Sequence, residues 1–187
     1  MNLYLDTATS DFLIILFDNS WKIIDHILIE NIAKKVDLLI ENFNLLLQRN
    51  NLNTSKIKSF YLNLGPGFFT GIRISLIFLR TISLLQNQEI YTTSSFKILN
   101  FVNPKLNEMY LDAQGGKLFY LNKDQFNKTN YLNNIKIIDS ENNQVNKINY
   151  YLFVDNFVNS KDIFTEETNI LNINPYYIKK PQIGSKK

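Results

Sequence analysis

The chain has 187 residues, of which 45% are hydrophobic, so it can bury one ordinary core or two small ones. Its formal charge is +3, with 20 basic residues against 17 acidic ones, and this mild balance gives no chain-wide field for nucleic acid. It has no cysteine, which excludes disulfides, thiolate metal sites and a cysteine nucleophile.

The longest uninterrupted apolar run, Phe12 to Phe17, is far shorter than the roughly 18 residues that a membrane-spanning helix needs. Asp6 stands near the amino terminus, where a secretory signal has a basic region followed by an apolar one. We therefore expect no membrane insertion and a cytoplasmic location.

The first part of the chain begins with three predicted strands. Leu3 to Leu5, Phe12 to Phe17 and Trp21 to Ile29 are rich in β-branched and aromatic residues. Turn residues separate the last two runs, so an antiparallel meander is expected. Apolar residues at helical spacing then predict an amphipathic helix from Ile32 to Arg49, whose core arc comprises Val36, Leu39, Ile40, Phe43, Leu46 and Leu47.

A fourth strand, Ser59 to Leu64, and a second helix from about Thr70 to Gln86 follow, which gives the order βββαβα. This order predicts an α/β fold, a mixed sheet with helices packed on a face, as in half of an actin-like or ribonuclease-H-like fold. Periodicity alone does not choose between those two.

The pattern changes after Asn100. Leu106 to Ala113 and Lys117 to Asn122 predict a hairpin around Gly115 and Gly116, and Ile148 to Val154 predicts a further strand. No helix is predicted there, and the Asn-rich stretch from 122 to 149 is expected to form loops. We therefore expect a first domain over residues 1–100 and a smaller, mainly β domain over residues 101–187.

The most informative segment is Gly-Pro-Gly-Phe-Phe-Thr-Gly-Ile-Arg, residues 65–73, between the fourth strand and the second helix. Its glycines allow positive φ or close backbone approach, and Pro66 stiffens the turn. Free amides at the helix start could face a phosphate or a partner; the structural alternative is a tight turn with Thr70 as helix cap. The segment matches neither a Walker loop nor a dinucleotide fingerprint.

Three segments in order carry a family resemblance: Leu-Asp-Thr-Ala-Thr at 5–9, Gly-Pro-Gly-Phe-Phe-Thr-Gly-Ile-Arg-Ile at 65–74 and Leu-Asp-Ala at 111–113. With these, and with Asn-Pro-Tyr-Tyr at 174–177, the chain resembles the TsaB (YeaZ) family. The likeness covers the first hundred residues well and the rest loosely. The chain departs from the family pattern at Phe68, where relatives usually carry Ser, and at Gln114, Gly115 and Lys117.

The resemblance implies an actin-like (ASKHA) fold and a non-catalytic scaffold that binds its paralogue TsaD in the machine that makes threonylcarbamoyladenosine in tRNA. It implies TsaE, an ATPase, as a partner in the assembled complex and tRNA as an indirect one. We expect no cofactor bound by this chain alone. ATP or ADP at the complex interface, and a homodimer when TsaD is absent, are left open.

The candidate site residues fall into three groups. The structural glycine loop comprises Gly65, Pro66, Gly67, Thr70, Gly71 and Arg73. Asp6 and Thr7 are candidates for a vestigial nucleotide loop, because a strand-end Asp in actin-like ATPases faces the metal and phosphates. The helical wheels predict surplus apolar surface on both helices, and the partner-binding residues expected from it are Leu38, Leu45, Ile72, Leu76 and Leu79.

Other function classes remain as alternatives. An autonomous ATPase or small-molecule kinase would need further glycine-rich loops and a second acid, for which Asp112 is the one plausible partner. A glycoprotease would need a nucleophile or a metal-binding His pair, but His26 is the single histidine and is expected to be a packed or edge residue. For direct RNA binding, only Tyr176 and Tyr177 with Lys179, Lys180, Lys186 and Lys187 give a hint.

Overall fold

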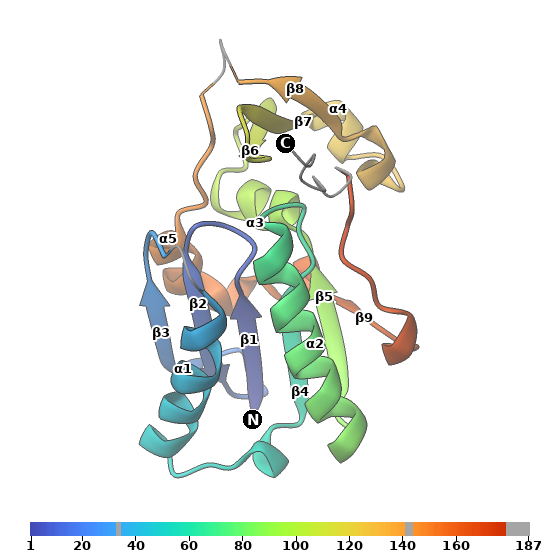
Figure 1. Cartoon of the computed structure of the whole chain (residues 1–187). Helices are drawn as coiled ribbons and strands as arrows, with labels where there is room; N and C mark the ends of the chain where they lie inside the picture. The colour runs from blue at the N-terminus through green and yellow to red at the C-terminus, as the bar shows by residue number, and fades with distance from the viewer. Residues whose placement is uncertain (33–34, 141–143, 179–187) are drawn as a thin grey trace, which may run out of the picture.

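The computed structural model describes residues 1–32, 35–140 and 144–178, and within them the chain forms two β-sheets with helices around the larger one (Figure 1). The larger sheet has six strands in the order β3-β2-β1-β4-β5-β9. These are β1 (Asn2–Asp6), β2 (Phe12–Phe17), β3 (Ile23–Ile29), β4 (Ser59–Asn63), β5 (Glu89–Thr93) and β9 (Thr165–Glu166). The chain is therefore an α/β protein with a mixed sheet, as the pattern predicts.

The two halves of the larger sheet have different strand directions. β1 pairs antiparallel with β2, and β2 with β3, so the predicted meander is confirmed. β1, β4 and β5 run parallel, which requires crossover connections, and α1 (Lys35–Arg49) and α2 (Phe69–Gln86) supply them. Both predicted helices are confirmed, although Ile32, the predicted start of the first, is not helical, whereas β5 was not predicted.

The larger sheet is covered on both faces, which explains why every residue of β2 is buried. Alternate side chains of β1 and β2 enter two core clusters. Leu3, Leu5, Phe12, Ile14 and Leu16 pack with α1 and α2 on one face, whereas Tyr4, Leu13, Ile15 and Phe17 pack with later segments on the other.

The predicted core-arc residue Val36 lies outside the side chains that the structure describes. Among those that it does describe, α1 differs from the prediction at one apolar and one polar position. Ile40, predicted to lie in the core arc, is 57% exposed. Asn42 is buried instead, and its amide donates a hydrogen bond of 2.8 Å to the Leu38 carbonyl one turn earlier. A polar side chain satisfied by its own helix can therefore occupy a buried position.

α2 is long and apolar enough to cross a membrane by length and composition, with a mean hydropathy of 1.3 over 18 residues. It is not an uninterrupted apolar run, because polar residues that include Arg73 and Arg80 divide it, and the expectation of no membrane insertion stays a prediction. The same test is passed by core helices of globular proteins, so a single such helix is weak evidence. Here one face of α2 packs on the sheet, and its buried residues are Gly71, Ile72, Ser75, Leu76, Leu79 and Ser83.

The second face of the larger sheet is covered by the rest of the chain. The smaller sheet has the order β6-β7-β8, formed by β6 (Glu108–Asp112), β7 (Lys117–Asn122) and β8 (Lys136–Asp139). The predicted hairpin is confirmed as β6 and β7, but β8 lies in a stretch predicted as loops. The helices here are α3 (Ser95–Val102), α4 (Lys123–Phe126) and α5 (Tyr150–Asp155), with short 3-10 turns at 131–134, 157–159, 161–163 and 170–172. Another 3-10 turn, at 54–56, precedes β4.

The strand predicted over Ile148 to Val154 is wrong, because this segment forms α5. The Asn149 side chain caps the helix by accepting a hydrogen bond from the Leu152 amide at 3.0 Å. Tyr150, Phe153 and Phe157 then recur at helical spacing and are all buried. The prediction of no helix after Asn100 is corrected with it.

The predicted domain boundary after residue 100 falls inside α3. Residues of β6, β7, α3 and α5 share one core cluster with β1, β2 and β4. The division into two domains stays a prediction.

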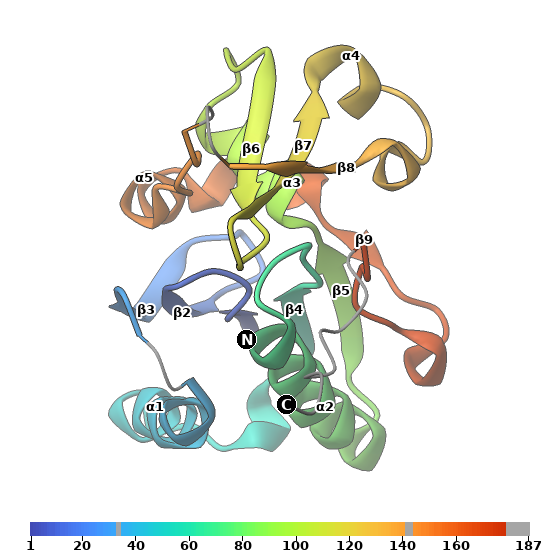
Figure 2. The ribbon, with the colours of Figure 1, turned by 45° about the horizontal axis from the view of Figure 1, so that its top comes forward.

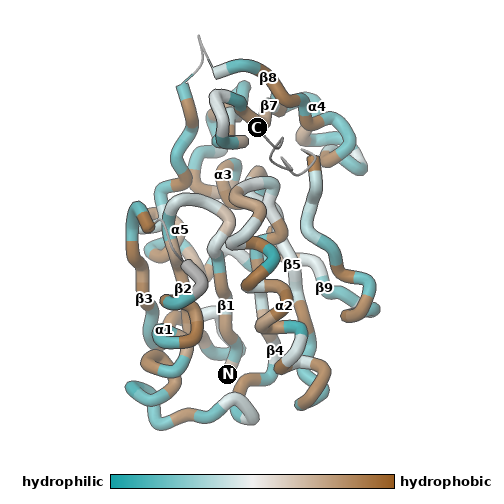
Figure 3. Tube along the Cα trace, viewed as in Figure 1, coloured by the Kyte–Doolittle hydropathy of each residue, from teal (hydrophilic) through white to brown (hydrophobic). Residues whose placement is uncertain are grey.

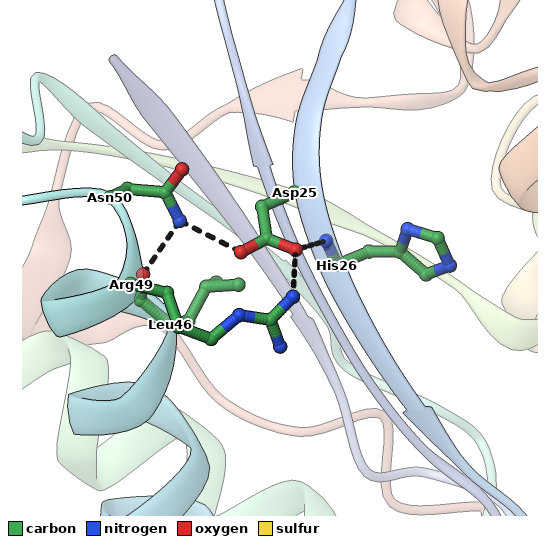
Figure 4. A network of polar contacts seen from close by, with 5 residues as sticks. All are labelled: Asp25, His26, Leu46, Arg49 and Asn50. Atoms are coloured by element: carbon green, nitrogen blue, oxygen red, sulfur yellow. Dashed lines mark hydrogen bonds and ion pairs between the residues drawn. The ribbon is translucent and has the colours of Figure 1, made fainter.

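A polar network fastens the end of α1 to the edge strand β3 (Figure 4). Asp25 accepts hydrogen bonds from the Arg49 guanidinium, the Asn50 amide and the His26 backbone N–H, each at 2.8 Å. The Asn50 amide also donates to the Leu46 carbonyl. The His26 side chain is exposed on this edge strand, so the predicted edge histidine is confirmed.

Candidate functional site

The three motif segments converge on one cavity of about 100 Å³, although they lie far apart in sequence. The residues that line it come from the loop after β1, from the connection between β4 and α2, and from the end of β6. Figure 2 shows the ribbons of these segments near one another. Residues 145–148 line the cavity as well. The residues that line it are Ala8, Thr9, Ser10, Asp11, Pro66, Gly67, Phe68, Leu111, Asp112, Val145, Asn146, Lys147 and Ile148.

Gly67 lets the glycine loop touch the backbone of the loop after β1. A Cβ atom at this position would lie 2.1 Å from the carbonyl oxygen of Ala8, far inside contact distance. The same oxygen accepts a hydrogen bond of 2.7 Å from the Phe68 amide. One amide at the start of α2 is therefore bound by the protein's own backbone, which weakens a phosphate-binding interpretation of this loop.

Gly71 makes a second close approach one turn later. A Cβ atom here would lie 2.1 Å from the carbonyl oxygen of Thr7. The Thr7 hydroxyl donates a hydrogen bond of 2.8 Å to the carbonyl oxygen of Gly71. The first two motifs therefore form one packed unit. Gly67 and Gly71 are required because the backbone of the loop after β1 leaves no room for a side chain at either position.

The other members of the predicted glycine loop have separate roles. Gly65 has a φ of 89° and precedes a cis peptide bond to Pro66. Thr70 is exposed within the first turn of α2, and the N-cap position is Phe68, so the predicted Thr70 cap is wrong. Arg73 is exposed, and its guanidinium lies 4.9 Å from the ring centroid of Phe69.

Asp6 is 1% exposed and lies at the centre of a buried polar network. Its Oδ2 accepts hydrogen bonds from the hydroxyls of Tyr4 at 2.7 Å and Tyr150 at 2.8 Å, and from the Asn63 amide at 3.0 Å. Its Oδ1 accepts a bond of 2.9 Å from the Ala8 amide. The four donors occupy about the number of lone-pair sites that a carboxylate has.

Burial raises the pKa of the Tyr4 and Tyr150 hydroxyls well above the ordinary tyrosine value, and the nearby Asp6 charge adds to this effect. Both therefore stay protonated and act as donors at neutral pH. Asp6 thus has a structural role: its hydrogen bonds fix the position of the loop after β1. Sequence reasoning missed Tyr4, Asn63 and Tyr150 as its partners.

The predicted partner acid, Asp112, does not join Asp6. It is exposed at the end of β6, where its carboxylate accepts a hydrogen bond of 2.7 Å from the Gln114 amide. Asp112 lines the cavity, whereas Asp6 is not among the described residues that do. Within the described ranges, no group of three or more His, Asp or Glu side chains is placed to hold a metal ion.

Residues 145–148 are held in place along the free edge of β6. Asn146 accepts a bond from the Tyr110 amide through its side chain and donates one to the Tyr110 carbonyl through its backbone, both at 2.7 Å. A single residue thus satisfies both backbone groups of Tyr110 and closes the cavity wall. Nothing in the sequence pattern pointed to this residue.

The second candidate site is the outer side of α1 and α2, which lie together on one face of the larger sheet (Figure 1). The rings of Phe43 on α1 and Phe78 on α2 pack against each other, with their centroids 4.9 Å apart. Both helices carry hydrophobic residues along their length (Figure 3). Several of their large apolar side chains are exposed. We call this set the outer helix surface: Ile40 (57%), Leu45 (42%), Ile77 (52%), Leu84 (50%) and Leu85 (80%).

The predicted partner-binding residues divide between surface and core. Leu45 belongs to the outer helix surface and Leu38 is half-buried. The assignment of Ile72, Leu76 and Leu79 is corrected, because they are at most 3% exposed. Leu76 and Leu79 belong to the core cluster on this face of the sheet. An advance of 100° per residue puts Ile40 on the Phe43 flank, towards α2, and Leu38 and Leu45 on the opposite flank.

No family model matches the chain. It is 32% identical over 97 residues to the uncharacterized protein MG208 of Mycoplasma genitalium, a match that covers 51% of this chain and 50% of that protein. The matched part therefore spans half the length of this curated relative.

Two solved structures have a similar fold. YeaZ from Pseudomonas aeruginosa has a TM-score of 0.51 and 20% identity, over 63% of this chain and 57% of that one. An uncharacterized protein described as similar to peptidase YeaZ from Pseudomonas aeruginosa has a TM-score of 0.63 and 15% identity, over 96% of this chain and all of that one. The resemblance seen in the motifs is thus confirmed at the level of the fold.

Proposed function

We propose that this chain is a member of the TsaB (YeaZ) family with an actin-like fold, and that it works in the cytoplasm as a non-catalytic scaffold. In this role it binds a TsaD-type transferase and supports the formation of threonylcarbamoyladenosine in tRNA. The YeaZ-like fold and the three ordered motifs support the proposal. TsaE and tRNA are then partners of the assembled complex.

The observation that carries the proposal is the outer helix surface. Five large apolar side chains on two neighbouring helices are 42% to 80% exposed, although each helix already buries a full face against the sheet. Grouped apolar side chains at a surface usually mark an interface. Two such helices can form a bundle with the equivalent helices of an actin-like paralogue, or of a second copy when the paralogue is absent.

The interior of the site also favours a scaffold over an enzyme. The Asp6 carboxylate is engaged by four protein donors, and the Phe68 amide by the Ala8 carbonyl. A phosphate-binding loop needs such groups to face the ligand. In a scaffold, these groups need only hold the start of α2 in place, because α2 is the helix that would dock on the partner.

The test is binding of the purified chain to the TsaD of the same cell, measured by size-exclusion chromatography and calorimetry. Leu84→Glu with Ile77→Glu places two charges on one stripe of α2 and should abolish complex formation. Leu38→Glu with Leu45→Glu places two charges on the flank of α1 opposite to α2 and should also abolish complex formation. Both pairs should leave the far-ultraviolet circular dichroism spectrum unchanged.

The comparison of the two pairs locates the interface. Loss of binding in both means that the partner spans both helices, and loss in one pair alone confines it to that side. Tyr151→Ala is a matched control, because this side chain is 60% exposed on α5, away from α1 and α2 (Figure 1). Native affinity in both charged pairs would contradict the proposed docking surface.

An autonomous ATPase or small-molecule kinase is the second candidate, because all three motif segments line one cavity. A peptidase is a third, since one similar structure is described by likeness to a peptidase. Assays of the isolated chain with ATP and with a peptide library separate these from a scaffold. Turnover that Asp6→Ala abolishes in a folded protein would replace the scaffold proposal.

A further inference from the structure

A group of aromatic rings lies on the face of the larger sheet opposite to α1 and α2. Tyr61 on β4 is at its centre. Trp21 in the turn between β2 and β3, Tyr91 on β5 and Phe164 just before β9 surround it, with ring centroids 5.2 Å, 4.6 Å and 5.2 Å from that of Tyr61. These three residues are partly buried. We call the four residues the aromatic site.

The hydroxyl of Tyr61 is an unused polar group in the middle of these rings. The Tyr61 side chain is only 7% exposed, and no described residue forms a hydrogen bond with its hydroxyl. This oxygen is not one of the fully buried polar atoms without a partner, so it reaches the surface of the protein. Since a nearly buried polar group without a partner is costly, an incoming donor at this point would gain a hydrogen bond.

The charges close to the Tyr61 hydroxyl come from acids. Burial raises the pKa of this hydroxyl well above its ordinary value, and Tyr91, Glu89 and Glu166 add to the rise. The Tyr91 hydroxyl donates a hydrogen bond of 3.4 Å to Glu89, and Tyr91 is in register with Glu166 on β9. Glu89 also pairs with Lys58 at 3.6 Å. Glu166 is exposed and forms no ion pair within the described ranges, so its negative charge is not neutralised there.

We propose that the aromatic site binds a guanidinium group, which donates hydrogen bonds to the Tyr61 hydroxyl oxygen and the Glu166 carboxylate while its flat face lies on a neighbouring ring. A guanidinium is planar, stacks on aromatic rings and presents several N–H donors at once. A quaternary ammonium would be attracted by the rings but has no donor for Tyr61 or Glu166. A compact ammonium would reach the acids but has no flat face for the rings.

The aromatic site is separate from the outer helix surface, because the two lie on opposite faces of the larger sheet. The inference therefore does not rest on the proposed function. The guanidinium belongs either to a free small molecule or to an arginine side chain of another protein. The lysines of the RNA-binding alternative lie outside the described residues and are not part of this proposal: Lys179, Lys180, Lys186 and Lys187.

Trp21 is the single tryptophan of the chain, so its fluorescence reports directly on this site. The isolated chain is titrated with N-acetylarginine amide at constant ionic strength. N-acetylcitrulline amide, which has nearly the same shape but no charge, is the matched control ligand. The arginine compound should give a saturable change in fluorescence and the citrulline compound should not. A parallel titration of free N-acetyltryptophan amide corrects for collisional quenching.

Two conservative variants test the groups that are assigned to the guanidinium. Tyr61→Phe should weaken binding by about tenfold or more, because it removes an acceptor for a charged donor. Its melting temperature should not fall, since this hydroxyl forms no bond within the described residues. Glu166→Gln should weaken binding by about two- to fivefold, the range for a surface ion pair. Glu41→Gln removes an exposed acid on α1 and should have no effect.

Equal responses to the arginine and citrulline compounds, or native affinity in both Tyr61→Phe and Glu166→Gln, would overturn the guanidinium site. Tighter binding of tetramethylammonium than of the arginine compound would also overturn it, because the rings alone would then select the ligand. A pentapeptide with one arginine between glycines separates the two sources. Markedly tighter binding of this peptide than of the arginine amide assigns the site to an arginine of another protein, and equal binding assigns it to a free small molecule.

Discussion

The hydroxyl of Tyr150 donates a hydrogen bond of 2.8 Å to the carboxylate of Asp6, a residue 144 positions earlier in the chain. This contact joins α5 to the end of β1, and both partners are buried. Through the Ala8 amide, the same carboxylate holds the loop that packs on Gly67.

Tyr150→Phe should destabilise the fold, because it removes one of the donors to a buried carboxylate while keeping the ring in the core. The expected loss is about 1–3 kcal/mol in the free energy of unfolding. Chemical denaturation followed by far-ultraviolet circular dichroism measures it. Tyr151→Phe, a hydroxyl bonded to Glu30 at the surface, should change the stability by less than about 0.5 kcal/mol. Equal effects of the two variants would show that burial of the Asp6 network does not matter.

The stability should also fall at alkaline pH. The pKa values of Tyr4 and Tyr150 are raised in the folded chain, chiefly by burial, so the folded state keeps two protons that the unfolded state releases above about pH 10. The unfolded state then binds fewer protons, and the free energy of unfolding decreases as the pH rises further. A denaturation series from pH 8 upward, at about half-unit steps, tests the sign. Tyr150→Phe should show a shallower decline than the native chain.

Gly71→Ala should destabilise the chain, because the added Cβ would lie 2.1 Å from a backbone oxygen of Thr7 that cannot turn away. Overpacking of this kind costs about 1–3 kcal/mol, and Gly71→Val should cost more. Thermal melting gives the loss. Thr70→Ala, an exposed neighbour in the same helical turn, serves as control and should melt within a few degrees of the native chain. An unchanged melting temperature for Gly71→Ala would mean that the two motif loops are not packed as described.

In the network at Asp25, the stability lost on removing Arg49 can be compared with the stability lost on removing Asp25 itself. Arg49 is half-exposed, with 49% of its side chain accessible, so Arg49→Ala should cost less than about 1 kcal/mol. Asp25→Ala also removes the bonds to Asn50 and to the His26 amide and should cost more, about 1–2 kcal/mol. Denaturation at low and high salt distinguishes them, since only the Arg49 contribution should shrink markedly with salt.

The elements with a clear period could be predicted from the sequence. The strands β1 to β4, both long helices and the hairpin of β6 and β7 follow from alternation, helical spacing and turn residues. The glycine loop could be recognised, but the reason for Gly67 and Gly71 could not, because the carbonyls that approach them lie some sixty residues earlier.

The missed features share physical causes. α3 and α5 are 8 and 6 residues long, too short for a periodic pattern to separate them from strands. β8 and β9 gain their strand conformation from pairing with β7 and β5. The partner-binding residues on α2 were misplaced because its apolar side chains surround most of the helix, and only the position of the sheet decides which are buried.

The cover on the second face of the larger sheet comes late in the chain. Leu13, Ile15 and Phe17 belong to one core cluster with Phe153 and Phe157, and β9 adds to the edge of β5 only at residues 165–166. During synthesis the early strands can therefore pair long before their second face is covered. A nascent chain halted before residue 150 would expose these side chains to solvent, and we expect it to need a chaperone until α5 has left the ribosome.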